Sequence, residues 1–156
     1  MAAQTTVALD ATDYQVLREL QEHARLAYKE LGRRVGLSAS AVIERVRKLE
    51  DAGVITGYHA AVDPARLGLP IEAYIRMRCF GERCILRDMA AAQFPEVLEA
   101  HRVSGSDCAL LRVRLTSVAH LQDLIDRLAQ FGPSDTALVL SSPVSERVLR
   151  AAPGAG

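Results

Sequence analysis

Aromatic residues are scarce in this sequence. The 156-residue chain contains no tryptophan, and aromatic residues make up 4% of it, whereas hydrophobic residues make up 49%. Apolar side chains are therefore numerous enough to form a core, and that core must be almost entirely aliphatic. The length suits one large domain or two small ones.

Long apolar runs are also absent. No stretch of about 18 apolar residues occurs, which excludes a membrane-spanning helix. The first ten residues contain no lysine, no arginine and no long apolar segment, so they do not form a secretory signal peptide. We therefore expect a cytoplasmic protein with no membrane partner.

Cysteine is rare as well. The three cysteines, Cys79, Cys84 and Cys108, are odd in number and unclustered, which predicts reduced thiols rather than a disulfide framework. The histidines are scattered without the spacing of metal ligands: His23, His59, His101 and His120. We expect no metal site and no cofactor.

A pattern typical of two helices joined by a tight turn occupies residues 26–53. The first helix is predicted at about 28–35, and Gly36 can end it because glycine readily takes a positive φ. Ser38 can cap the second helix by accepting a hydrogen bond from a free backbone N–H of its first turn. Gly53 is expected to stop that helix.

The second of these helices has two different faces. At about 100° per residue, the face predicted to be buried consists of Val42, Ile43, Val46 and Leu49. The exposed face is small and polar near its start and charged further on, with Arg45 on its flank: Ser40, Ala41, Glu44, Arg47 and Lys48.

Positive charge is concentrated around this helix pair. The whole chain balances 19 basic side chains with 19 acidic ones, but residues 25–48 carry seven basic side chains against two acidic ones. Small and polar residues can enter a DNA major groove, and cations can meet its phosphates. The alternative is an ordinary helical hairpin with a solvated basic face, and the local charge favours DNA binding.

The predicted DNA contacts differ along the helix. Phosphate binding is expected to depend on the cationic end, and base choice on Ser40 and Glu44, because Glu44 can accept a hydrogen bond from a cytosine amino group. The full predicted set is Ser38, Ser40, Ala41, Glu44, Arg45, Arg47 and Lys48.

The segments beside the helix pair complete a small domain at residues 9–63. A further helix is predicted before the helix pair. Asp10 can cap its start, and its apolar residues follow at helical spacing: Val16, Leu17, Leu20 and Ala24. The β-prone residues 54–63 are expected to form a wing-like strand or the strand that leaves the domain. Residues 1–8 are expected to be flexible, and Pro64 marks a linker at 64–69.

The second half of the chain predicts a different architecture. Alternating or helical periodicity indicates, in order, a strand at 71–80, a helix at 82–93, strands at 97–103 and 108–115, a helix at 118–128 and a strand at 136–140. This βαββαβ order is ferredoxin-like, so the fold class is α+β, with a second domain at 70–150 and a flexible tail at 151–156.

The helices of such a domain cover one face of its sheet. Its other face is predicted to carry four partly apolar residues and to be covered by an identical subunit: Tyr74, Leu98, Cys108 and Leu110. Ferredoxin-like folds include enzymes, but the chain has no GxSxG or GxxxxGK motif and no paired carboxylates at a plausible site. We therefore expect no enzymatic activity.

Three segments resemble the Lrp/AsnC (leucine-responsive, feast/famine) transcription regulators. Their helix-turn-helix, here about 26–45, and exit segment are similar to KELGRRVGLSASAVIERVRKLEDAGVITGYHAAVDPARLGL. Their first helix is similar to LDATDYQVLRELQEHARLAYKEL, and the core of their C-terminal effector domain to VLEAHRVSGSDCALLRVRL. The likeness, from about Leu9 to Leu149, implies a winged-type helix-turn-helix domain, an effector domain, homodimers or higher oligomers, and regulation of transcription. The alternative within DNA binding is an architectural, nucleoid-organising protein.

The residues Ser104 to Asp107 are by themselves typical of a simple hairpin turn. The resemblance implies instead that this turn lies where dimers meet and helps to hold a small effector, usually an amino acid, through Ser104, Gly105, Asp107 and Cys108. The commonest family pattern has an Asp at the position of Cys108. Asp107 stands one residue earlier, and because adjacent strand residues point to opposite faces, its carboxylate is expected not to reach the same place. The thiol of Cys108 is more typical of packing than of a redox switch.

Overall fold

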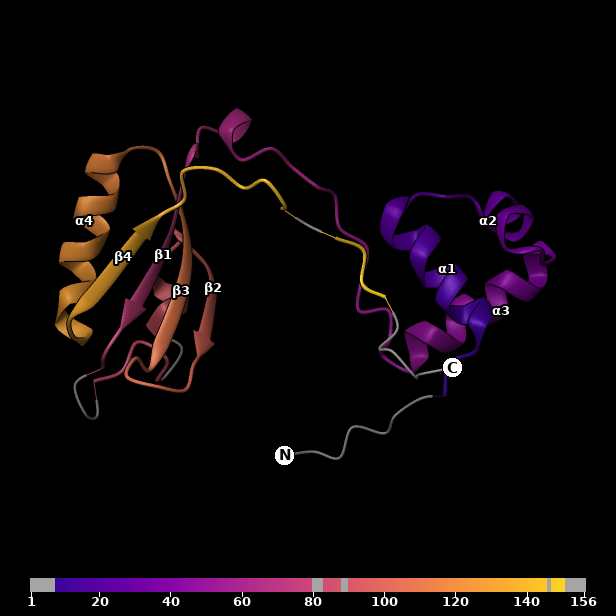
Figure 1. Ribbon diagram of the computed structural model, residues 1–156, viewed down its shortest axis with the longest axis horizontal. Coiled ribbons are helices and arrows are strands. Elements are labelled where there is room, and N and C mark those ends of the chain that lie inside the picture. Colours follow the sequence, from indigo (N-terminus) through magenta and orange to yellow (C-terminus); the bar gives the residue numbers. More distant parts are fainter. Residues whose placement is uncertain (1–7, 80–82, 88–89, 146, 151–156) are drawn as a thin grey trace. The chain divides into compact units, whose positions relative to one another are not determined.

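The computed structural model describes residues 8–79, 83–87, 90–145 and 147–150 (Figure 1). The chain divides into two compact units. The first comprises the residues up to Ala61 together with the C-terminal segment from Val144, and the second is Val62–Pro143.

Two hydrogen bonds connect this C-terminal segment to the first unit. The Leu149 backbone N–H donates to Gln21 Oε1 at 2.8 Å, and Gln21 Nε2 donates to the Leu149 carbonyl oxygen at 3.2 Å. Periodicity cannot reveal such pairing, because the two residues lie 128 positions apart.

The first unit contains three helices, α1 (Ala11–Glu22), α2 (Tyr28–Val35) and α3 (Ala39–Asp51). Asp10 caps α1 through a reciprocal pair of hydrogen bonds with Asp13, and Ser38 caps α3 by accepting from the Ala41 N–H at 3.2 Å. The aliphatic core predicted from the sequence lies where these helices meet: Val16, Leu20, Leu31, Val42, Val46 and Leu49.

Two predictions for the first unit are wrong. No strand forms among residues 54–63, all of which are described, so the expected wing or exit strand is absent from this chain. Ile43, predicted to be buried, keeps 43% of its surface exposed. It lies about 100° around the helix from the fully buried Val42, which turns it away from the core.

The second unit is built on a four-stranded antiparallel sheet in the order β2-β3-β1-β4. Its strands are β1 (Ile71–Met77), β2 (Val97–Arg102), β3 (Ala109–Leu115) and β4 (Ser134–Leu138). One α-helix, α4 (Val118–Leu128), covers one face of the sheet (Figure 1). The α+β class and the strand order along the chain are as predicted.

The helix predicted at residues 82–93 is wrong in its described part. Only Ala90–Gln93 is helical there, as a short 3-10 helix, and residues 80–82 and 88–89 lie outside the described residues. Ile85 is completely buried, and a tight turn follows it, in which the Arg87 N–H donates to the Cys84 carbonyl oxygen at 2.8 Å. Ile85 thus anchors this non-helical turn in the core, and Leu86 packs beside it.

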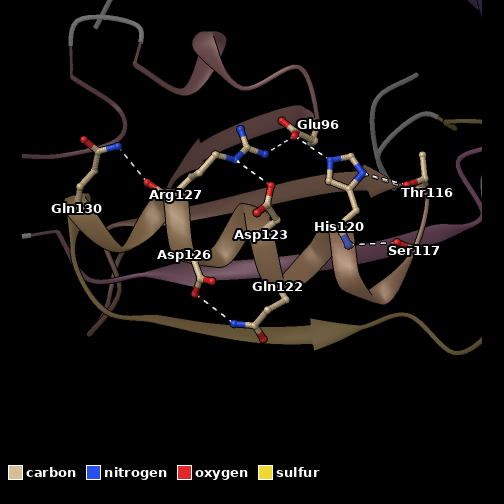
Figure 2. A network of polar contacts seen from close by, with 9 residues as sticks. All are labelled: Glu96, Thr116, Ser117, His120, Gln122, Asp123, Asp126, Arg127 and Gln130. Atoms are coloured by element: carbon tan, nitrogen blue, oxygen red, sulfur yellow. Dashed lines mark hydrogen bonds and ion pairs between the residues drawn. The ribbon is translucent and has the colours of Figure 1, made fainter.

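A polar network connects α4 to the start of β2 (Figure 2). The carboxylate of Glu96 is almost fully buried, and its Oε1 accepts hydrogen bonds from Arg127 and from His120 Nε2, the latter at 3.0 Å. The core behind it is mostly aliphatic, and the ring of its buried Phe94 lies 5.5 Å from the Arg127 guanidinium. Burial alone would raise the pKa of Glu96. The hydrogen bonds from His120 and Arg127 outweigh burial, so the pKa of Glu96 lies below the usual value of 4.5.

Candidate DNA interface and effector site

The turn between α2 and α3 is held by close backbone packing. Gly36 takes the left-handed conformation predicted for it, with φ of 71°. Gly32, inside α2, is buried, and a Cβ at this position would lie 2.6 Å from the Leu37 carbonyl oxygen. Only a glycine lets the two helices approach this closely. Gly32 was not predicted from the sequence, where its single signal is a glycine inside a helical segment.

The exposed side of α3 carries a continuous row of residues, here called the α3 stripe: Ser40, Ile43, Glu44, Arg47 and Lys48. Of the other residues predicted to bind DNA, Ser38 is occupied as the helix cap and also lies 3.1 Å from Ser40 through their hydroxyl groups. Ala41 is half-buried beside the stripe. The structure therefore brings most of the predicted set onto one surface and adds Ile43 to it.

The charges of the α3 stripe are unevenly paired. Lys48 Nζ lies 2.9 Å from Glu44 Oε1 one helical turn away, both side chains are exposed, and this hydrogen bond lowers the pKa of Glu44. Within the described part of the chain, no ion pair involves Arg47. An exposed, unpaired guanidinium is available to a phosphate, whereas Lys48 must exchange one anionic partner for another.

Arg45 has different surroundings from its neighbours. Its Nη1 lies 2.8 Å from Asp10 Oδ2 and 2.6 Å from Asp13 Oδ1, the two acids that cap α1. The side chain is 31% exposed, and these carboxylates raise the pKa of its guanidinium. The contact ties α3 to the start of α1, which favours a positioning role for Arg45 over contact with DNA.

The two arginines of α2 are also paired within the unit. Arg33 and Arg34 both donate to Glu30, and Arg34 also reaches Glu19. Hydrogen bonds from Arg33 and Arg34 lower the pKa of Glu30 to about 2. Part of the positive excess seen in the sequence is therefore neutralised in place.

The β2–β3 turn, residues 103–108, lies at one end of the sheet and is closed by a hydrogen bond of 3.4 Å from the Val103 N–H to the Cys108 carbonyl oxygen. Gly105 has φ of 113°, and none of the described residues beyond its neighbours lies within 4 Å of the place a Cβ would take. Ser104 is exposed, and Asp107 is half-buried with its Oδ1 3.9 Å from Arg78 Nε. The turn thus offers exposed backbone beside a carboxylate and a guanidinium.

Cys108 does not lie on the outer sheet face as predicted, and its thiol packs against the core. Its Sγ accepts a hydrogen bond from the Cys79 N–H at 2.9 Å and donates to the Met77 carbonyl oxygen at 3.1 Å, so it packs at the edge of the core rather than on the outer sheet face. The three thiols predicted to be unclustered also come together, with all Sγ atoms within 4.8 Å of one another. Strand pairing explains why Cys79 and Cys108 are neighbours, because Met77 at the end of β1 lies opposite Ala109 at the start of β3, and Cys84 joins them from the loop that follows β1.

A capped recognition-type helix in a three-helix unit, joined to a separate antiparallel α+β unit, defines a DNA-binding transcription regulator with a ligand-binding domain. Residues 9–50 match the AsnC-type helix-turn-helix domain, and residues 81–149 match the Lrp/AsnC ligand binding domain. The HTH-type transcriptional regulator YezC of Bacillus subtilis is 42% identical over 134 residues, which cover 86% of this chain and 95% of that protein. The chain belongs to the Lrp/AsnC family of transcription regulators, which are not enzymes.

Solved structures share the same arrangement of the chain. The structure of LrpC from Bacillus subtilis matches with a TM-score of 0.84 and 28% identity, covering 90% of this chain and all of that one. A transcriptional regulator from Neisseria meningitidis in complex with L-Met matches with a TM-score of 0.80 and 32% identity, covering 90% of this chain and 96% of that one. Among the described residues, no helix is long and apolar enough to cross a bilayer.

Proposed function

We propose that this regulator binds operator DNA through the α3 stripe and that an amino acid bound at the β2–β3 turn adjusts that binding. The observation that carries the first part is the α3 stripe itself, a small and polar start followed by Arg47 and Lys48 on the exposed side of a capped helix. Such a helix fits a major groove, where side chains read base edges and cations meet phosphates.

Each residue of the stripe has a distinct proposed role. Ser40 and Glu44 lie nearer the helix start and read base edges, whereas Arg47 and Lys48 contact phosphates. Ile43 lies exposed between them, and its apolar side chain suits the methyl group of a thymine. Arg45 holds α3 against α1 through its bonds to Asp10 and Asp13.

Selection of binding sites from a random-sequence DNA pool tests the first part. We expect enrichment of a defined sequence with two half-sites about 10 bp apart or a multiple of it, because a dimer presents two recognition helices. Ile43→Ala should relax the choice of an A·T pair at one position of each half-site, and Gln122→Ala, which changes an exposed residue of α4, should change nothing. Uniform coating without enrichment would favour the architectural, nucleoid-organising alternative.

The amino-acid part of the proposal is supported by the exposed backbone of the β2–β3 turn, by the Asp107 carboxylate beside Arg78 and by the L-Met complex of the related regulator. Backbone amides and Arg78 suit the carboxylate of an amino acid, and Asp107 suits its ammonium group. A ligand that binds only the native state raises its stability by mass action, so a thermal-shift screen of the twenty amino acids can find it.

Gly105 is the sharpest probe of the turn. No described atom within this chain blocks a larger residue there, but φ of 113° strains any side chain, and a Trp would fill the space above the turn. We expect Gly105→Trp to abolish the thermal shift by the effector found in the screen while binding to a single operator stays unchanged. Loss of single-operator binding would mean that the turn is structural, and a retained shift would place the effector elsewhere.

A further inference from the structure

Three cysteine thiols converge at one end of the sheet, although the sequence spreads them over thirty positions. Cys79 follows β1, Cys84 lies in the next loop, and Cys108 directly precedes β3. Their Sγ atoms all lie within 4.8 Å of one another, and each residue is half-buried. These three residues are called the cysteine cluster below.

We propose that the cysteine cluster binds one thiophilic divalent metal ion, such as Zn²⁺, through three thiolates, with a fourth position left for water. Zn²⁺ binds thiolate sulfur at about 2.3 Å, so the sulfurs around a tetrahedral ion lie roughly 3.8 Å apart. The cluster is already within 4.8 Å, so small side-chain movements complete the site. Within the described residues, no His, Asp or Glu joins the group, which makes it a three-sulfur site with one open position.

The surroundings of the cluster suit thiolate ligands. The Cys79 N–H already donates to Cys108 Sγ at 2.9 Å, a bond that a metal-bound thiolate keeps, whereas the bond from Cys108 Sγ to the Met77 carbonyl is given up with the thiol proton.

Charge and access also fit an ion. Binding of one Zn²⁺ to three thiols releases three protons and leaves a complex with one negative charge. Arg102 acts electrostatically on Cys84 and offsets that charge. Cys84 also lines a surface depression of about 300 Å³, which gives an ion a path from solvent.

The position of the site links it to the β2–β3 turn. Cys108 is the last residue of that turn, so a bound ion would fix the base of the turn to the end of β1. This consequence for regulation rests on the proposed function, whereas the metal site itself does not. The two are separated experimentally because the binding assay contains neither DNA nor amino acid.

The test uses the full chain, reduced with a phosphine, stripped of metal with a chelator and titrated with Zn²⁺ against a chromophoric competitor. We expect one Zn²⁺ per chain, protection of all three thiols from alkylation and release of protons on binding. Co²⁺ in place of Zn²⁺ should give thiolate-to-metal charge-transfer absorption.

Variants identify the ligands. Loss of a group that only orients a ligand lowers metal affinity about 10–100-fold, so Cys79→Ser, Cys84→Ser and Cys108→Ser should each lower it by about 100-fold or more. His101→Ala is the control, because this exposed imidazole is paired with Glu99 and its loss should leave the affinity unchanged. The alkylation assay on the unaltered protein needs no variant and stays informative if a variant fails to fold.

Three results would overturn the proposal. One is the same Zn²⁺ affinity in the unaltered chain and in a chain with all three cysteines replaced by serine. Another is an alkylation rate that Zn²⁺ does not change. The third is rapid disulfide formation under mild oxidation that Zn²⁺ does not slow, which would assign the cluster to redox chemistry.

Discussion

Gly32 sets the distance between α2 and the turn that leads into α3. Its missing Cβ leaves room for the Leu37 carbonyl oxygen, which would otherwise lie 2.6 Å away, and that oxygen belongs to backbone that cannot rotate aside. Gly36 has a different task, since it supplies the positive φ that ends α2 and has open space around it. The two glycines can therefore be distinguished by experiment.

Gly32→Ala is expected to lower the free energy of unfolding by about 1–3 kcal/mol, because an inserted methyl group overpacks the helix pair. It should also weaken operator binding after the loss of folded protein is taken into account, since α3 must move. Gly36→Ala is the matched control. It should cost about 1–2 kcal/mol through strain alone and leave the operator affinity of the folded protein unchanged. Chemical denaturation and fluorescence anisotropy measure the two quantities, and equal operator affinities for both variants would contradict this reading.

Glu96 ties α4 to the start of β2 through His120 and Arg127 (Figure 2). Its pKa is lower in the folded chain than its usual value of 4.5. The stabilisation that it provides is therefore complete above about pH 4.5 and is lost as the pH falls through the lower folded pKa. We expect Glu96→Gln to lower the free energy of unfolding by about 1–2 kcal/mol at pH 7, where charged hydrogen bonds are lost.

That difference between Glu96→Gln and the unaltered chain should shrink as the pH falls below 4.5, because the carboxylate becomes protonated in both states of the unaltered chain. Urea denaturation over a pH series measures it. Asp123→Asn on α4 is a control, because this acid is exposed and its Oδ2 comes no closer than 3.9 Å to Arg127 Nε. A difference that stays constant down to the lowest pH would show that the Glu96 charge is not the source.

The helix α3 combines two functions on opposite sides. Val42, Val46 and Leu49 anchor it in the core, whereas the α3 stripe faces outward. Arg45 lies between the two sides and is held by the acids that cap α1. Substitutions in this one helix can therefore distinguish a cation that contacts DNA from a cation that stabilises the fold.

Each phosphate contact that is lost should flatten the dependence of log affinity on log salt by about 0.9. We expect this change for Arg47→Ala and for Lys48→Ala, with weaker binding to all sequences and unchanged stability. Arg45→Ala should instead lower the free energy of unfolding and leave the salt slope of the folded protein unchanged. Titrations at several salt concentrations measure the slopes, and a flattened slope for Arg45→Ala would return this residue to the DNA contacts.

At the scale of the whole molecule, the sheet face opposite α4 is a candidate interface with a second copy of the chain. It is less apolar than predicted, because Glu72, Arg112 and Arg114 form a salt-bridge network across it. Tyr74 remains 38% exposed and Leu110 half-buried on the same face. Mixed polar and apolar surfaces of this kind are common where subunits meet.

Sedimentation of the full chain should therefore show a dimer or a larger oligomer without DNA. A charge buried at such an interface is costly, so Leu110→Glu should dissociate the assembly at micromolar concentration. Leu140→Glu is the matched control, because Leu140 is 90% exposed, and it should leave the assembly intact. If the unaltered chain sediments as a monomer, the proposal that a dimer binds two half-sites is wrong.

Local chemistry made much of the first unit predictable. Gly36 ends α2, Ser38 caps α3 and Asp10 caps α1, as expected, because each of these acts through atoms only a few residues away. Ile43 was misplaced because it lies at the edge between the two faces of α3, where an angle alone cannot decide burial. The exposure of the other residues of the α3 stripe was predictable from the helical period: Ser40, Glu44, Arg47 and Lys48.

The sequence by itself thus determined the helix-turn-helix, the α+β class and the position of the predicted DNA-binding face, because helix periods, caps and strand alternation are local. Only the tertiary structure decided which groups meet across long separations. Pairing of β1 with β3 brings Cys79 and Cys108 together, and Cys84 joins them from the loop between β1 and β2. Packing of α3 on α1 brings Arg45 to Asp10 and Asp13. Such contacts depend on how whole elements pack against one another. They cannot be predicted from the spacing of residues along the chain, because the residues that meet are far apart in the sequence.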